Sequence, residues 1–158
     1  MAVLKMERHA ADNVYLHKDF HKALNHALIY LERRYGEEAV RAYLHDFSAA
    51  YYAPLAADLK KRGLAALQEH FQHLYDLEGG DVTIEMLPNP ERLSITVRSC
   101  PAVAHIRAAG DSVSPLFQLT SSVVNETICT GSDFQATLSD YDPDTGACVQ
   151  TFSRREPL

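Results

Sequence analysis

The sequence of 158 residues contains no tryptophan, only three cysteines and no excess of basic residues. Three widely spaced cysteines, an odd number, do not form the framework of a small secreted disulfide-rich domain. The 15 Lys and Arg against 21 Asp and Glu give a net charge of -6. This balance argues against nucleic-acid binding through phosphate neutralisation. We therefore expect a cytoplasmic protein with no nucleic-acid partner.

Long hydrophobic runs are also absent. No segment approaches the roughly 20 apolar residues of a membrane-spanning helix, so we expect no membrane partner. The N-terminus lacks the apolar segment of a secretion signal. The 46% hydrophobic and 23% charged residues are typical of a globular protein, and the length suits one domain. We expect a single domain over 1–158, with an N-terminal arm (1–14), a helical half (15–79) and a mixed half (80–158).

Apolar residues in the first half recur at helical spacing. The pattern predicts helices over 16–35, 37–62 and 64–78. Pro54 lies inside the second pattern, so a kink or a break is expected near Tyr52 and Ala53. Gly36 and Gly63 follow the first and second patterns and suit helix ends.

The second half changes to an alternating pattern that indicates strands. It predicts strands over 82–87, 93–98, 134–138 and 147–154, with helices over 101–109 and 114–129 between the two pairs. The fold class is therefore α+β: N-terminal helices packed on a small, mostly antiparallel sheet of two hairpins separated by helices.

Cys100 is the most interesting single residue, because it directly precedes Pro101, which favours the first position of a helix. A thiol at a helix N-terminus faces the positive end of the dipole, which lowers its pKa. His105 lies in the same predicted helix and Arg98 in the strand before it. A reactive thiol near these groups would suit nucleophilic catalysis. A buried structural cysteine at an element boundary is the alternative, and Cys129 and Cys148 are expected to be packing residues.

The eight histidines include two close pairs. His17 and His21 are four residues apart, and His70 and His73 are three apart, so each pair shares a helix face. Such pairs can ligate a metal, but neither has the carboxylate that a zinc or di-iron motif needs at the right spacing. They remain weak metal candidates, and we expect neither a metal nor another cofactor.

Polar and aromatic residues elsewhere suggest a small-molecule pocket. Tyr51 belongs to a tyrosine-rich segment near Pro54, where a hydroxyl could serve as a polar handle in an apolar wall. Ser121 and Asn125 share one face of a predicted helix that is otherwise apolar. These two side chains point either into a cavity or toward water, and the pattern leaves both alternatives open.

The order of motifs along the chain resembles the L-2-amino-thiazoline-4-carboxylic acid hydrolase family. More distantly, it is similar to the four-vinyl-reductase-type small-molecule-binding domains. The matching parts are Tyr35-Gly36-Glu37-Glu38, Arg98-Ser99-Cys100-Pro101, Gly110, Gly131, and the segment from Gly146 to Phe152 that contains Cys148.

The resemblance implies hydrolysis of a C–N bond in a small cyclic or amide-like substrate, with a cysteine involved. Cys100 matches the family's Cys-Pro pair. In the family, a cysteine followed three residues later by an aspartate opens the long central helix. Here the matching residues are Gln118-Leu119-Thr120-Ser121, which implies an altered or lost activity.

Three hypotheses follow, of which a metal protein that uses His17 and His21 or His70 and His73 has the least support. The first is a hydrolase in which Cys100 is the nucleophile, His105 the base, and Arg98 or Arg107 the group that binds a substrate carboxylate. The second is a non-catalytic small-molecule-binding or sensor domain, with Tyr51, Ser121 and Asn125 at the ligand. The first two have a small molecule as the partner. A homodimer is also compatible with the sequence, which does not identify the surface.

Overall fold

The computed structural model describes residues 18–89 and 91–156; the expected N-terminal arm and His17 lie outside this range. Its elements are α1 (Lys18–Tyr35), α2 (Glu37–Tyr51), α3 (Ala53–Arg62), α4 (Leu64–Glu78), β1 (Asp81–Pro88), β2 (Glu91–Ser99), α5 (Pro101–Ala108), α6 (Leu119–Ile128), β3 (Phe134–Ser139) and β4 (Cys148–Arg154). The predicted α+β class is confirmed.

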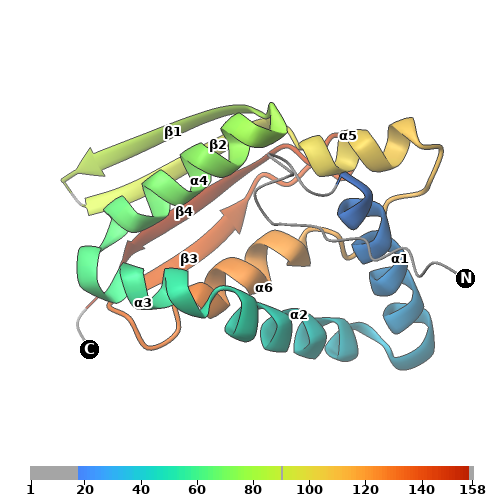
Figure 1. Cartoon of the computed structure of the whole chain (residues 1–158), viewed down its shortest axis with the longest axis horizontal. Coiled ribbons are helices and arrows are strands. Elements are labelled where there is room, and N and C mark those ends of the chain that lie inside the picture. Colours follow the sequence, from blue (N-terminus) through green and yellow to red (C-terminus); the bar gives the residue numbers. More distant parts are fainter. Residues whose placement is uncertain (1–17, 90, 157–158) are drawn as a thin grey trace, which may run out of the picture.

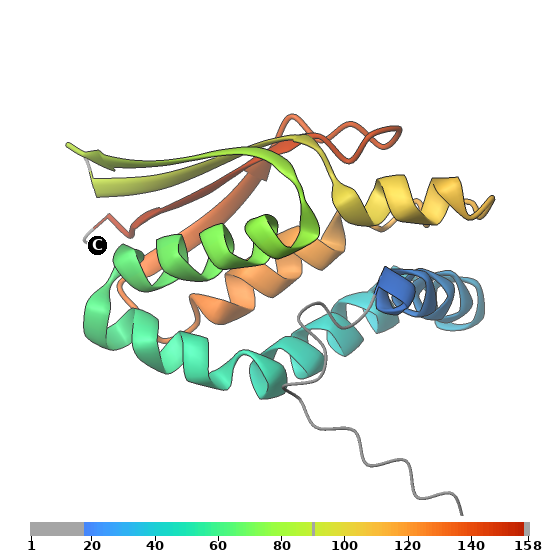
Figure 2. The same cartoon turned by 45° about the horizontal axis from the view of Figure 1, so that its top comes forward.

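The four strands form one antiparallel sheet in the order β1-β2-β4-β3. Each of the two predicted hairpins supplies two neighbouring strands, and the pairing of β2 with β4 joins them. Helices cover one face of this sheet, while its other face carries no helix among the described residues (Figures 1 and 2).

The alternating pattern of the strands explains which face is covered. On β2, Leu93, Ile95 and Val97 are almost fully buried under the helices, and on β4 Phe152 is fully buried. The residues between them, such as Thr96, point to the open face and stay partly exposed. Burial of the apolar face therefore fixes the register of the central strands.

The predicted break near Pro54 is confirmed. α2 ends at Tyr51 and α3 begins at Ala53, with the proline at the start of the new helix, where its missing N–H costs little. Gly63, with a φ of 66°, then separates α3 from α4. Three helical patterns in the sequence thus become four helices.

The helix predicted over 114–129 is wrong at its start, because α6 begins at Leu119. Residues before it turn instead, with the Ser114 hydroxyl accepting the Leu116 N–H at 3.2 Å. Asn25 of α1 holds this segment: its Nδ2 donates to the Ser112 carbonyl and its Oδ1 accepts the Ser114 N–H, both at 2.8 Å. A contact 89 residues away along the chain thus delays the helix.

Among the described residues, no helix combines the length and the apolar character needed to cross a bilayer.

Candidate functional site

A small cavity of about 30 Å³ lies between the helices and the sheet. It is lined by Tyr75, Val97, Cys100, Val103, Phe117, Thr120, Ser121, Tyr141, Gly146, Cys148 and Gln150. Most of these are thiol, hydroxyl or amide groups, and no charged side chain is among the described residues that line it. The volume suits a molecule about the size of water.

A chain of hydrogen bonds holds the polar side of the cavity. Asn125 Nδ2 donates to Gln150 Oε1 at 2.7 Å, and Gln150 Nε2 donates to the Tyr75 hydroxyl at 3.1 Å. The exposed fractions of Asn125 and Gln150 are only 4% and 3%. Because buried amides are costly without partners, these bonds fix the orientation of all three side chains.

Cys100 lies at the predicted position, as the N-cap residue of α5. Its side chain makes no capping hydrogen bond, although the nearby backbone N–H groups of Val103 and Ala102 act to lower its pKa. Burial nevertheless outweighs this effect and raises the pKa of Cys100 above its ordinary value of 9.0. The predicted lowering of this pKa is therefore wrong, because the thiol is removed from water.

The neighbouring thiol of Cys148 shows the same trend. Burial, helped by Cys100, raises the pKa of Cys148 to about 11. Burial likewise raises the pKa of Tyr141 to about 12, with both cysteines contributing. These groups are therefore protonated at neutral pH and present hydrogen-bond donors to the cavity.

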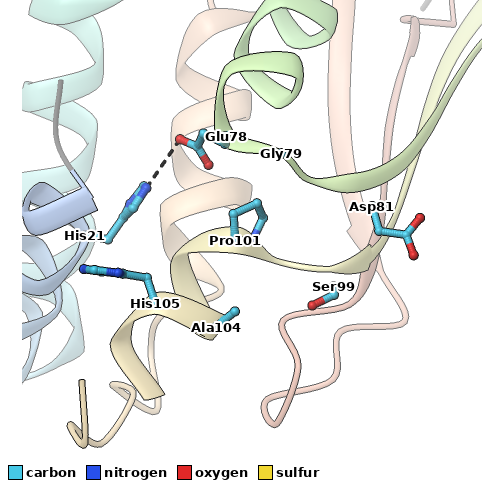
Figure 3. Close-up of a pocket in the computed structure, with 8 residues that line it drawn as sticks. All are labelled: His21, Glu78, Gly79, Asp81, Ser99, Pro101, Ala104 and His105. Carbon is cyan, nitrogen blue, oxygen red and sulfur yellow. Dashed lines mark ion pairs between the residues drawn. The ribbon is translucent and has the colours of Figure 1, made fainter. Parts of the chain in front are cut away.

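His105 lies on the other side of α5, away from this cavity. It lines a separate, open cleft of about 340 Å³ together with His21 of α1 and Glu78 of α4 (Figure 3). His21 Nε2 lies 3.4 Å from Glu78 Oε1. Cys100 and His105 thus line different cavities, and the structure does not assemble them as a nucleophile and its base.

The remaining sequence candidates divide into two groups. Ser121 lines the cavity, and Asn125 reaches it through Gln150, so the expected shared face points inward. Tyr51 is 67% exposed and stacks on Phe47, with ring centroids 5.3 Å apart. Arg98 lies on the open face of the sheet and donates to Asp81 Oδ1 at 2.9 Å. Neither Tyr51 nor Arg98 is among the residues that line the cavity.

Arg107 also points away from the cavity, toward the loop that joins β3 and β4. It donates to Asp144 Oδ1 at 3.1 Å. The second residue named for a substrate carboxylate therefore has an acidic neighbour in its own chain.

The histidine pairs do not form a metal centre in the part of the chain described. No group of three His, Cys, Asp or Glu residues there could hold a metal ion. Burial lowers the pKa of His70, helped by the neighbouring His73, so His70 is neutral at pH 7. His17, the partner of His21 in the sequence pattern, lies outside the described residues.

Five polar residues that line the cavity were not singled out as site residues from the sequence: Tyr75, Thr120, Tyr141, Cys148 and Gln150. A signal for Gln150 was present in the sequence. It lies two residues from both Cys148 and Phe152, so the three side chains share the face of β4 that points to the core. A polar residue at a core-facing position of a strand indicates a buried polar site.

The loop over 140–147 covers Cys100 and closes one side of the cavity. The Cys100 N–H donates to the Thr145 carbonyl at 3.0 Å. At the two ends of the loop, Asp140 and Gly146 have left-handed backbones, with φ of 53° and 68°. A Cβ added to Gly146 would lie 2.5 Å from the Cys100 Cβ, so the loop backbone rests directly on the cysteine.

Comparison of the chain with protein-family models, with curated proteins and with solved structures finds no significant match. The candidate site therefore stands on its geometry.

We predict that Gly146→Ala destabilises the fold by several kcal/mol, because the new methyl group clashes with Cys100 and Val103. Gly110→Ala is the matched control: its φ of 81° is also left-handed, but open space surrounds it, so a cost of about 1–2 kcal/mol is expected. Urea unfolding measures both. Equal costs would show that the loop does not rest on Cys100.

We also predict slow alkylation of Cys100 by iodoacetamide at neutral pH. Because burial raises the pKa of Cys100, the labelling rate should be low at pH 7 and should keep increasing with pH beyond the ordinary pKa of 9.0. Peptide mass spectrometry measures the rate, and the urea-unfolded chain is the control. Faster labelling of the folded protein than of the unfolded chain at pH 7 would contradict the prediction.

Proposed function

We propose that the chain is a small-molecule-binding domain whose ligand occupies the cavity beside Cys100. The observation that carries this proposal is the convergence of hydrogen-bonding side chains from α4, α6 and β4 on one point of an otherwise apolar core. Burying Asn125, Gln150 and Tyr75 together costs desolvation that a purely apolar core would avoid. A ligand that uses these groups gives a reason for that cost.

The lining indicates the chemistry of the ligand. The donors and acceptors are neutral at pH 7, since burial raises the pKa values of Cys100, Cys148 and Tyr141. An ionised ligand would lose its hydration without meeting an opposite charge, which is strongly unfavourable. We therefore propose a neutral, compact molecule with an amide-like edge, able to replace the bond between Gln150 and Tyr75.

Access requires movement of the 140–147 loop, because the cavity of about 30 Å³ is too small for an organic ring. The polar contacts that hold the loop include the Cys100–Thr145 bond, the bond from Arg107 to the Pro143 carbonyl and the exposed Arg107–Asp144 pair. An exposed ion pair contributes at most about 1 kcal/mol, so it opposes opening only weakly.

A second candidate is a cysteine-dependent hydrolase similar to the L-2-amino-thiazoline-4-carboxylic acid hydrolases. The position of Cys100 at the N-terminus of α5 favours it, because the backbone N–H groups of Val103 and Ala102 act to lower the pKa of the thiol. The sulfur would add to the C=N carbon of the ring, the ring C–N bond would break with protonation of nitrogen, and water would release the thiol. The net reaction adds one water molecule to the substrate.

Two lactams that differ by one carboxylate test the binding proposal. We expect 2-pyrrolidinone to raise the unfolding temperature and pyroglutamate to leave it unchanged. At 100 times its dissociation constant, the bound ligand should add about 2.7 kcal/mol to the free energy of unfolding. Gln150→Leu should abolish the response, whereas Gln135→Leu on the open face should keep it. Failure of both lactams, or stronger binding of the carboxylate, would count against a neutral ligand.

Incubation with L-2-amino-thiazoline-4-carboxylate tests the hydrolase. If the second candidate is right, mass spectrometry shows a product heavier by one water, and Cys100→Ala abolishes its formation while Cys129→Ala does not. Turnover that survives in Cys100→Ala would exclude the cysteine mechanism.

A further inference from the structure

β1 is an edge strand that lacks most of the usual protection against pairing. It lies at one end of the sheet, with β2 as its only neighbouring strand within the described residues (Figure 1). Natural edges are blunted by charged side chains, especially lysine, and by internal proline, bulges or short length. The charged residues of β1 are Asp81 and Glu85. β1 is eight residues long, contains no lysine or arginine, and has proline only at its last position. Its one irregularity falls between Asp81 and Val82.

The core-facing side chains of β1 are also incompletely covered. Val82, Ile84 and Met86 are half-buried, whereas their partners on β2 are almost fully buried. The opposite edge is shorter, because β3 has six residues; it packs against α6, as β1 packs against α4. The incompletely covered apolar side chains and the backbone edge that no described strand pairs with therefore coincide at β1.

We propose that a second copy of this chain covers this edge, with the two β1 strands paired antiparallel about a twofold axis through Ile84. The pairing joins two four-stranded sheets into one of eight strands. An axis perpendicular to the sheet keeps the covered faces of both copies on the same side. Opposite residues must then share a face, as Val82, Ile84 and Met86 do.

Three registers near the middle of β1 place residues of the same face opposite one another, with the axis at Thr83, Ile84 or Glu85. The charges of Asp81 and Glu85 favour the axis at Ile84. With Thr83 on the axis, Asp81 would oppose Glu85 of the partner subunit. With Glu85 on the axis, the two copies of Glu85 would lie opposite one another. Directly opposed like charges destabilise a strand pair.

With Ile84 on the axis, these clashes disappear. Val82 then lies opposite Met86 of the partner subunit, and Asp81 lies opposite the partner's Leu87. The half-buried apolar side chains of the two edges thus cover one another.

Arg98 adds a complementary charge at the same edge. Its guanidinium donates to Asp81 Oδ1 at 2.9 Å and to the Thr83 hydroxyl at 2.6 Å. In the proposed register, Thr83 lies opposite Glu85 of the partner subunit, which brings that carboxylate beside Arg98. Twofold symmetry repeats the contact, so charge complementarity favours a second copy over an unrelated extended peptide.

Cysteine cross-linking tests the register. Residues on the axis have Cα atoms about 4.5–5.5 Å apart, within reach of a disulfide. Under mild oxidation, Ile84→Cys should give a covalent dimer that Thr83→Cys and Glu85→Cys do not give. Stronger cross-linking of either other variant would overturn the register, and no cross-linking in all three would overturn the interface.

Sedimentation of the unmodified chain and of two charge variants tests the partner. We expect a dimer that Glu85→Lys weakens at least tenfold, because lysine would face Arg98 of the partner subunit. Thr137→Lys, on the exposed side of the other edge strand, should leave the dimer unchanged. A wild-type monomer at all concentrations, or a dimer broken by Thr137→Lys alone, would overturn the proposal. Circular dichroism confirms folding of each variant.

Discussion

The amide of Gln150 is the constraint on which the arrangement of this molecule depends. It projects from the central strand β4, bonds Asn125 of α6 through its oxygen and Tyr75 of α4 through its nitrogen, and is almost fully buried. A buried polar group left without a partner costs about 1–3 kcal/mol, so α4 and α6 must stay where they satisfy it. The apolar residues around it set how tightly the layers pack. The amide sets where the two helices lie relative to the sheet, and the cavity forms at that junction.

Features of the fold that arise from neighbouring residues could be predicted from the sequence, whereas features that arise from contacts between distant residues could not. Strand faces followed from the alternation of Leu93, Ile95 and Val97, and the break between α2 and α3 followed from Pro54, because both effects are local. The start of α6 could not be found this way, since Asn25 of α1 holds the preceding turn. The raised pKa of Cys100 was equally out of reach, because the loop that covers the thiol comes from 140–147.

The separation of Cys100 from His105 was, by contrast, within reach of helical geometry. Five residues along an α-helix turn through about 140° relative to the start, which places the two side chains on different sides of α5. The helix therefore divides two environments. One is a small cavity lined by neutral hydrogen-bonding groups, and the other is a larger, open cleft lined by His21 and Glu78. On the first side, loss of water is the main influence on the pKa values of the cysteines, whereas the cleft on the second side stays open to solvent.

The strand order has a consequence for synthesis on the ribosome. β4 is the last of the described strands along the chain, yet it occupies a central place between β2 and β3. A growing chain that has emerged only as far as β3 cannot complete the sheet, and Leu93, Ile95 and Val97 then border an unpaired edge. Pairing β2 with β4 also closes a long stretch of chain, which slows folding. The nascent protein therefore passes through a stage with exposed apolar strands, to which chaperones would bind.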